Sequence, residues 1–232
     1  MSSRIRRKLR RLRERIEPQI EVEQKKVAIL TPAGDLVHTT FAFNLSRMIL
    51  HTLTTMDEPM GLTLQSYGSS MIPHSRQKLA TWALEVGCTH MLWIDSDMEF
   101  PADMLLRFLR HSEPIVGINA CQRRPPYLNT AQSEPHKPLP MNLESRGLEK
   151  VWRTGFGVMW TASEVFRKLE PPWFELQWIP ESAVFRGEDY VFCEKARAAG
   201  YEIYVDHDLS REINHLGVYG FNPLMKVGTQ AT

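Results

Sequence analysis

The sequence predicts an α/β domain with an open, mostly parallel β-sheet and helices on both faces. Short apolar runs that end at turn residues recur between residues 25 and 118, and segments with the 3.6-residue spacing of amphipathic helices separate them. Strands that alternate with helices in this way form parallel sheets, because each crossover returns the chain to the same edge. The 232 residues, 43% hydrophobic and 24% charged, suit one domain with a real core and an appendage.

In the first half of the chain the elements alternate regularly. We expect buried strands at residues 27–30, 90–94 and 115–118, a strand of alternating pattern at 62–67, and helices at residues 39–54, 75–85 and 101–110. Thr31-Pro32-Ala33-Gly34 is a loop after the first strand, and Gly87 suits the end of the second helix. Pro101 suits the first turn of the third helix, because the missing N–H of proline needs no partner there.

The second half is less regular. Residues 121–147 are rich in Pro, Asn, Ser and charge, and indicate a long loop over the sheet edge, a kind of segment that is often functional. After it we expect a strand at 148–153, a tight turn at 154–157, a strand at 158–160, helices at 163–169 and 188–199, and a strand at 201–205.

Charge divides the chain into a basic arm and a mildly acidic domain. Residues 1–16 carry a net charge of +7 and the remainder −6, although the whole chain is only +1. Ile5, Leu9, Leu12 and Ile16 fall on one side of a helix. We therefore place a basic amphipathic arm at residues 1–23, the domain at 24–222 and a tail at 223–232.

Three interpretations of the arm stay open. It is a solvated helix that packs its narrow apolar stripe, a helix that binds an anionic membrane surface or a protein partner, or, least favoured, a nucleic-acid arm. The three cysteines lie far apart without a CxxC pattern, which predicts neither a disulfide framework nor a zinc ribbon. Together with the absence of a secretory signal, this predicts a cytoplasmic protein, with a peripheral position at the inner face of the membrane if the arm binds lipid.

The main chemical signal is Asp95-Ser96-Asp97, which directly follows the apolar run at 90–94. Ligands of open α/β sheets bind beyond the carboxyl ends of the strands. Two carboxylates one residue apart can converge on a hard divalent cation such as Mg²⁺ or Mn²⁺, which often shares its coordination with substrate phosphates. The alternative is a loop whose acids only complement the N-terminus of the next helix.

Two further signals follow. Glu188 and Asp189, after Gly187, open a helix; they either complement its N-terminus or present a carboxylate base at a cleft. His215 lies in a loop after the last strand, where a single histidine is either structural or a metal ligand. Residues 206–208 (Asp-His-Asp) form a competing acidic and histidine cluster nearby in sequence.

These signals, in this order, resemble the GT-A-fold nucleotide-sugar glycosyltransferases, especially short bacterial and phage-type members with a DxD motif. The resemblance covers residues 26–217. It includes the strand and loop at 27–32, Ile72-Pro-His-Ser-Arg-Gln77, residues 89–101 around the DSD, Thr154-Gly-Phe-Gly157, Arg186-Gly-Glu-Asp189 and His215-Leu-Gly217. It implies a GT-A-like, Rossmann-like fold. It also implies a metal-dependent transfer of sugar from a nucleotide diphosphate sugar, with UDP-sugar as the expected donor, to a glycan, lipid or other hydroxyl acceptor.

The resemblance also implies roles for individual residues. Asp97 and His215 would bind Mn²⁺ (or Mg²⁺), and Asp95 would face the ribose or reach the metal through water. Asp189 would be the acceptor-side base, with Glu188 as its neighbour. The donor would be bound by Thr31, Pro32, Arg76, Gly155 and Gly157.

Some features depart from the family or stay open. Gln77 stands where many relatives have Asn, and residues 121–147 and 171–186, the expected acceptor region, carry no recognisable motif. Trp173, Phe174 and Trp178 either stack on sugar rings or pack in the core. The sequence does not decide between inversion and retention. A nucleotidyltransferase on a related sheet and a catalytically silent sugar- or membrane-binding module are the alternative functions.

Overall fold

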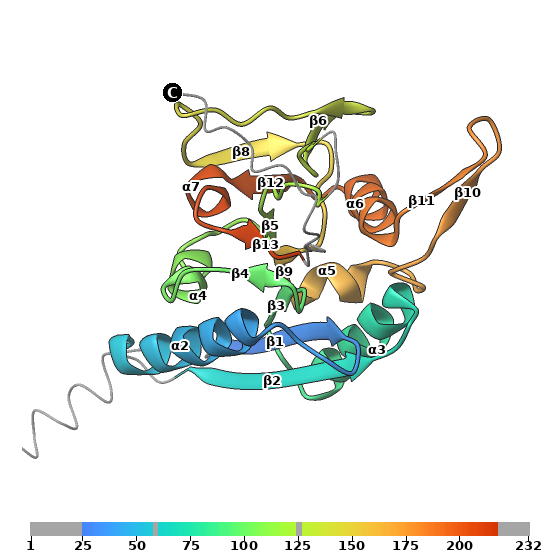
Figure 1. Ribbon diagram of the computed structural model, residues 1–232. Helices are drawn as coiled ribbons and strands as arrows, with labels where there is room; N and C mark the ends of the chain where they lie inside the picture. Colours follow the sequence, from blue (N-terminus) through green and yellow to red (C-terminus); the bar gives the residue numbers. More distant parts are fainter. Residues whose placement is uncertain (1–24, 58–59, 124–126, 218–232) are drawn as a thin grey trace, which may run out of the picture.

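The structure, a computed structural model, describes residues 25–57, 60–123 and 127–217. Its main sheet has seven strands, and Figure 1 shows them stacked from β2 to β8. Their order is β2 (Gly61–Gly68), β1 (Lys26–Ala33), β3 (His90–Ile94), β9 (Val158–Ala162), β5 (Ile115–Gly117), β12 (Ile203–Asp206) and β8 (Leu148–Val151). The predicted arm at 1–23 and tail at 223–232 lie outside the described residues, so these boundaries stay predictions.

The sheet is mostly parallel, as the sequence predicts. β1 pairs in parallel with β2 and β3, and β12 with β5. β9 lies antiparallel between β3 and β5, and β8 is an antiparallel edge strand beside β12. The strands β1, β2, β3, β5 and β12 therefore point the same way, and their carboxyl ends share one edge of the sheet.

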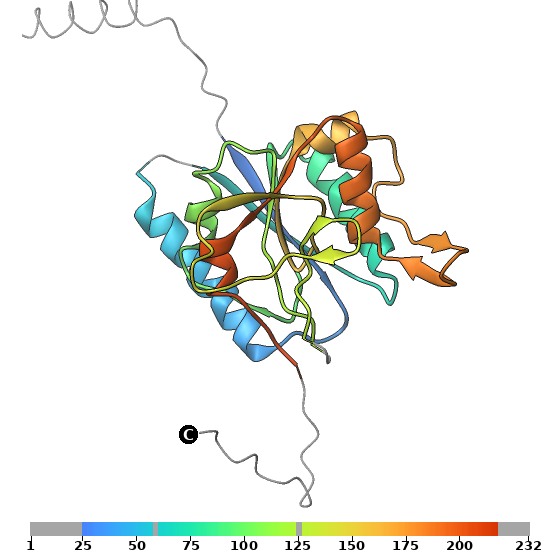
Figure 2. The same ribbon diagram turned by 90° about the horizontal axis from the view of Figure 1, so that it is seen from above.

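Helices cover both faces of the sheet, as Figure 2 shows from above. α2 (Thr39–Thr55), α4 (Met104–Phe108) and α7 (His207–Ser210) pack on one face, and α3 (Ile72–Glu85), α5 (Ser163–Lys168) and α6 (Glu188–Ala198) on the other. The first strand shows why both faces are apolar: Ala28 and Leu30 join one core cluster, and Val27 and Ile29 join the other. A strand buried on both faces needs a continuous apolar run, and the run at 27–30 is of that kind.

The helices begin and end close to their predicted positions. Gly87 and Gly200 follow α3 and α6 with φ angles of 72° and 91°, a left-handed conformation that glycine adopts at least cost. The helix predicted at 101–110 is shorter in the structure, where α4 covers only Met104–Phe108. No described helix is long and apolar enough to cross a membrane.

The structure also has short elements that the sequence analysis did not predict. β6 (Gln132–Glu134) and β7 (Lys137–Pro138) pair within the segment expected to be a long loop, and β10 (Gln177–Ile179) and β11 (Val184–Arg186) form a second hairpin. β4 (Met98–Glu99) pairs with β13 (Asn214–His215). Elements of two or three residues show too little periodicity to be recognised in a sequence.

Candidate active site

The Asp95-Ser96-Asp97 turn follows β3 at the carboxyl edge of the sheet, as predicted. The backbone N–H of Asp95 donates to the carbonyl of Gly157 (2.9 Å), which ties the turn to the start of β9. The backbone N–H of Met98 donates to the carbonyl of Asp95 (3.1 Å) and closes the turn. Below the turn, Trp93 is fully buried, and its indole N–H donates to Thr161. The two carboxylates therefore stand on a rigid base.

The β4–β13 pairing brings His215 to Asp97. His215 lies opposite Met98 in this ladder, and the backbone N–H of Leu216 donates to the carbonyl of Asp97 (2.7 Å). Nε2 of His215 lies 3.5 Å from Oδ2 of Asp97, and Nδ1 lies 3.0 Å from the carbonyl oxygen of Cys121. Nδ1 can donate its proton to this carbonyl. The ring is then oriented so that Nε2 faces the carboxylate of Asp97.

The charges of this pair shift both of its pKa values. The contact with Asp97 raises the pKa of His215, although partial burial opposes the shift. Burial by itself would raise the pKa of Asp97, but its interaction with His215 and the charge of Arg123 outweigh burial and lower that pKa. Both groups therefore favour their charged forms.

Arg123 is a site residue that the sequence analysis did not single out. Its Nη1 lies 2.8 Å from Oδ2 of Asp97 and donates to the carbonyl of Leu216 (3.1 Å). It comes from the segment after β5, which the sequence analysis interpreted as a loop over the sheet edge in the expected acceptor region. A basic residue in such a loop was the available signal.

A second charge cluster joins α3, the turn and α6. Nη2 of Arg76 lies 2.9 and 3.1 Å from the two carboxylate oxygens of Asp95, and Nη1 pairs with Glu188. The guanidinium is buried, only 4% exposed, and lies 5.2 Å from the ring centre of Phe156. Burial raises the pKa of Asp95, and the charge of Arg76 opposes this effect. In this structure Arg76 holds two carboxylates in place, and its predicted contact with the nucleotide stays a prediction.

Asp189 lies beside this cluster at the start of α6. Its Oδ1 accepts a hydrogen bond from the N–H of Tyr190 (2.7 Å), and its Oδ2 approaches Gly155, where an added Cβ would lie 3.5 Å away. An added Cβ at Gly187 would lie 2.7 Å from Oδ1, so a larger residue at this position would displace the carboxylate. Burial and the charge of Glu188 raise the pKa of Asp189 to about 6. The group is therefore a base near neutral pH.

The other predicted donor residues lie at the same edge. The prediction of a loop from Thr31 was wrong, because β1 continues to Ala33: Thr31 and Pro32 pair with Ser66 and Tyr67 of β2. The Thr31 hydroxyl is buried and makes no hydrogen bond within the described residues. Gly157 carries the carbonyl that binds the Asp95 N–H. These positions are compatible with a bound donor and stay predictions for it.

The Asp206-His207-Asp208 cluster is structural. Asp206 accepts a hydrogen bond from the Leu209 N–H at the start of α7 and also pairs with His111. His207 is buried and lies 2.7 Å from Glu149, and Asp208 accepts from the N–H of Gly147. These contacts fix α7 to β8, and none of the three residues contacts Asp97 or His215 in the part of the chain that the structure describes.

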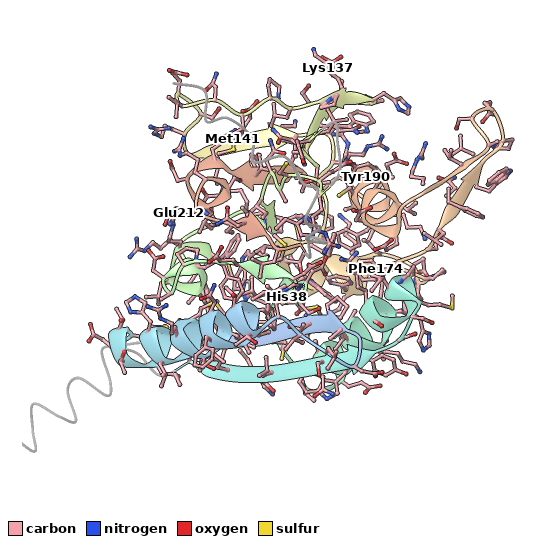
Figure 3. The ribbon with its side chains drawn as sticks, viewed as in Figure 1. His38, Lys137, Met141, Phe174, Tyr190 and Glu212 are labelled. Carbon is pink, nitrogen blue, oxygen red and sulfur yellow. The ribbon has the colours of Figure 1, made fainter. Side chains whose placement is uncertain are left out.

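The aromatic residues before α6 divide into two groups. Trp173 and Phe174 are buried and pack in the core, and Figure 3 shows Phe174 against the body of the domain. Trp178 is 50% exposed on β10 and packs against Phe185 of β11, which is 62% exposed. Figures 1 and 2 show this hairpin projecting from the domain. Of the three predicted aromatic residues, only Trp178 is accessible to a ligand.

The described residues do not form a complete metal site. They contain no group of three or more His, Cys, Asp or Glu side chains arranged to hold a metal ion. Asp97 and His215 supply one oxygen and one nitrogen donor, and Asp95 is engaged by Arg76. Mg²⁺ is commonly held by one or two protein carboxylates together with substrate phosphates, so the metal roles of Asp97 and His215 stay predictions.

Comparison with solved structures finds, among other matches, two that align over more than four fifths of the chain. Protein A197 from STIV is 10% identical, with a TM-score of 0.52, and the alignment covers 85% of this chain and 97% of that one. The catalytic domain of Drosophila beta1,4-galactosyltransferase 7, in complex with xylobiose, is 13% identical with a TM-score of 0.50, covering 84% and 71%. The chain has a GT-A-type fold. No protein-family model matches its sequence, and a search of curated proteins finds no match.

The GT-A-type fold explains why the predicted residues converge. In this topology β3 and β1 end side by side, and the reversed strand β9 brings the 154–157 turn back to the same edge. Asp95, Asp97, Glu188, Asp189 and His215 all lie around this edge, although 120 positions separate the first from the last.

Proposed function

We propose that this protein is a metal-dependent glycosyltransferase that moves a sugar from a nucleotide diphosphate sugar, with a UDP-sugar as the expected donor, to an acceptor hydroxyl. The contact of Asp97 with His215, next to a carboxylate base at one edge of a GT-A-type fold, supports this proposal best. The solved relative from Drosophila is named as a galactosyltransferase, which agrees with sugar transfer.

The donor side of the proposed reaction requires stabilisation of negative charge on the departing diphosphate. A cation bound by Asp97 and His215 would supply electrostatic stabilisation of that charge. Arg76 orients Asp95 at the same turn and opposes the effect of burial on its pKa, because its guanidinium contacts both carboxylate oxygens. Thr31, Pro32 and the Gly155–Gly157 turn line the approach to this edge. The Asp95 side chain is 29% exposed, and we expect a ribose hydroxyl to bind at this exposed part.

The acceptor side requires removal of a proton from the attacking hydroxyl. Asp189, with a pKa of about 6, is ionised at neutral pH and is basic enough to accept a proton. Glu188 is held by Arg76, which leaves Asp189 as the member of the pair without a cation partner among the described side chains. If the enzyme inverts the sugar carbon, Asp189 is the general base. If it retains the configuration, Asp189 holds an acceptor hydroxyl.

We assign the β10–β11 hairpin to the acceptor side of the proposed active site. β11 ends at Arg186, and after Gly187 the chain enters α6 with Glu188 and Asp189. The exposed rings of Trp178 and Phe185 therefore stand on the segment that leads directly to the proposed base. Exposed aromatic rings provide flat apolar surface for the apolar faces of sugars.

Donor binding tests the proposal most directly. We expect calorimetry to detect Mn²⁺-dependent binding of UDP or a UDP-sugar to the wild-type chain. Asp97→Ala should reduce that binding at least about 10-fold, since the cation loses its carboxylate. Asp189→Asn serves as the matched control, because it also removes one negative charge but should leave donor binding intact and suppress transfer.

Three outcomes would contradict the proposal. Unchanged donor binding in Asp97→Ala would exclude the metal assignment. Exchange of pyrophosphate, in place of release of nucleoside diphosphate, would indicate a nucleotidyltransferase. If no nucleotide sugar bound or was hydrolysed in the presence of Mn²⁺, the protein would be a silent binding module.

A further inference from the structure

Arg123 occupies the place at which a cation would have to bind Asp97. Its Nη1 lies 2.8 Å from Oδ2 of Asp97, the same oxygen that lies 3.5 Å from Nε2 of His215. A divalent cation held by both Asp97 and Nε2 of His215 would bind at this oxygen, because it is the carboxylate oxygen that faces Nε2. A guanidinium nitrogen already lies at hydrogen-bond distance from this oxygen, and its positive charge would repel a divalent cation that binds beside it. Cation binding therefore requires Arg123 to leave Asp97.

The position of Arg123 allows this movement. Its side chain is 47% exposed, and its only other polar contact among the described residues is to the carbonyl of Leu216 (3.1 Å). An exposed ion pair of this kind contributes little stability, so its separation costs little. By contrast, Arg76 is buried between two carboxylates and is not free to move.

A pocket next to this ion pair offers space for an anionic group. It has a volume of about 410 Å³, and Arg123 and His215 lie in its lining together with Gln122, Tyr127 and Asn214. Arg123 supplies a permanent positive charge to this lining. A diphosphate that reaches over the turn would therefore meet a guanidinium as well as a cation. The planar fork of arginine is well suited to phosphate oxygens.

We propose that Arg123 is a resident counter-ion of Asp97 that exchanges its partner when substrate binds. In the free protein it neutralises Asp97 and competes with the divalent cation. When the nucleoside diphosphate arrives, Arg123 moves to the phosphate oxygens and the cation takes its place at Asp97. The cation and the diphosphate then bind cooperatively, and each raises the affinity of the other by the same factor. This inference rests on the proposed function, since it concerns the same site.

The proposal predicts effects of opposite sign for one substitution. In Arg123→Gln, Mn²⁺ alone should bind about 5-fold or more tightly than to the wild type, because its competitor is gone. UDP in the presence of saturating Mn²⁺ should bind about 10-fold more weakly, because the diphosphate loses a guanidinium. Calorimetry and the electron paramagnetic resonance of free Mn²⁺ measure both affinities without any turnover.

Two further variants separate this role from general effects of charge. Arg146→Gln removes a guanidinium that is 62% exposed and lies away from Asp97, and it should change neither affinity. Arg123→Lys keeps a positive charge, so the affinity for Mn²⁺ alone should stay near the wild-type value. UDP binding in this variant should recover in part.

Each remaining outcome decides against the proposal. Weaker or unchanged Mn²⁺ binding in Arg123→Gln would show that Arg123 does not compete with the cation. Tighter Mn²⁺ binding with unchanged UDP affinity would show that Arg123 does not move to the diphosphate. If the wild type binds Mn²⁺ and UDP but the variant behaves identically, this inference fails alone. If the wild type binds neither ligand, the proposed function fails with it.

Discussion

Asp189 has a carboxyl group whose surroundings oppose its charge. Burial and the neighbouring charge of Glu188 raise its pKa to about 6 from an ordinary value near 3.8, in spite of the charge of Arg76. In the folded protein the carboxyl therefore holds its proton more tightly than in the unfolded chain. Ionisation of Asp189 thus lowers the stability of the fold as the pH rises from about 4 to above 6. Carboxyl groups whose pKa is shifted in this way are common in functional sites.

This penalty predicts that Asp189→Asn stabilises the fold while it suppresses transfer. An asparagine Oδ1 can still accept the hydrogen bond of the Tyr190 N–H, and it carries no charge. At pH 8 we expect a gain of about 1–2 kcal/mol in the free energy of unfolding, after allowance for the solvent contact that Asp189 retains. The gain should shrink toward pH 4, where the wild-type carboxyl is protonated. Denaturant unfolding of both proteins at several pH values measures it, and a gain independent of pH would contradict this explanation.

The same pKa predicts the acid limb of the activity profile. If Asp189 accepts the proton of the acceptor hydroxyl, transfer should fall about 10-fold for each pH unit below 6. Release of nucleoside diphosphate by hydrolysis of the donor should fall less, because water can attack without that base. Steady-state rates of both reactions across pH 4.5–8 provide the comparison. Identical profiles for transfer and hydrolysis would argue against Asp189 as the base.

Some site residues could be identified in the sequence and others could not. Asp97 and Asp189 were identifiable because each follows a strong local signal, an apolar strand or a helix start. Arg123 was not, because its role depends on a contact with Asp97 across 26 positions of the chain. The resemblance placed Arg76 near the nucleotide, which stays a prediction, and a spacing argument cannot show that its guanidinium is buried between Asp95 and Glu188.

Among the elements, the smallest ones complete the site. The two-residue ladder of β4 and β13 sets His215 beside Asp97, and a short hairpin carries the exposed aromatic rings. Larger elements supply the rigid base: α3, α5 and α6 enclose an aromatic cluster that includes Trp93, Phe156 and Phe192. Such packing keeps the proposed base in one position, because its helix cannot shift without opening the cluster.

Among the elements, we predict that the β10–β11 hairpin binds the acceptor. The double substitution Trp178→Ala and Phe185→Ala should raise the KM for acceptor about 10-fold or more and leave donor hydrolysis unchanged. Stability should change by less than about 1 kcal/mol, because both rings are at least half exposed. Phe43→Ala is the matched control, since Phe43 is also exposed (66%) but lies on α2, on the other face of the sheet. An unchanged acceptor KM in the double variant would exclude this role.

For the molecule as a whole, the uneven distribution of charge is the main feature. Residues 1–16 carry +7 and the remaining chain −6, so the two parts differ in sign. The described domain contains the complete main sheet and both core clusters without these residues. The domain and the arm are therefore expected to act separately.

Deletion of residues 1–16 should consequently spare the fold and the proposed chemistry. The melting temperature and donor hydrolysis should match those of the full chain. If the arm binds an anionic membrane surface, the full chain should sediment with vesicles that contain phosphatidylserine, less so at high salt, and the deleted chain should not. Sedimentation of neither protein would favour a solvated arm or a protein partner, and loss of folding in the deleted chain would show that our domain boundary is wrong.

The sequence alone determined the alternation of the main strands and helices. It also determined where along the chain the Asp95-Ser96-Asp97 turn, the helix start at Glu188 and the late histidine lie. Apolar periodicity, glycines and prolines act over a few residues, so local patterns suffice to place these elements and motifs along the chain. Tertiary structure decided which charges meet: Arg123 with Asp97, Arg76 with Asp95 and Glu188, and His215 with the turn through a two-residue ladder. These contacts depend on the strand order β1-β3-β9-β5, and no local pattern encodes the order in which distant strands pair.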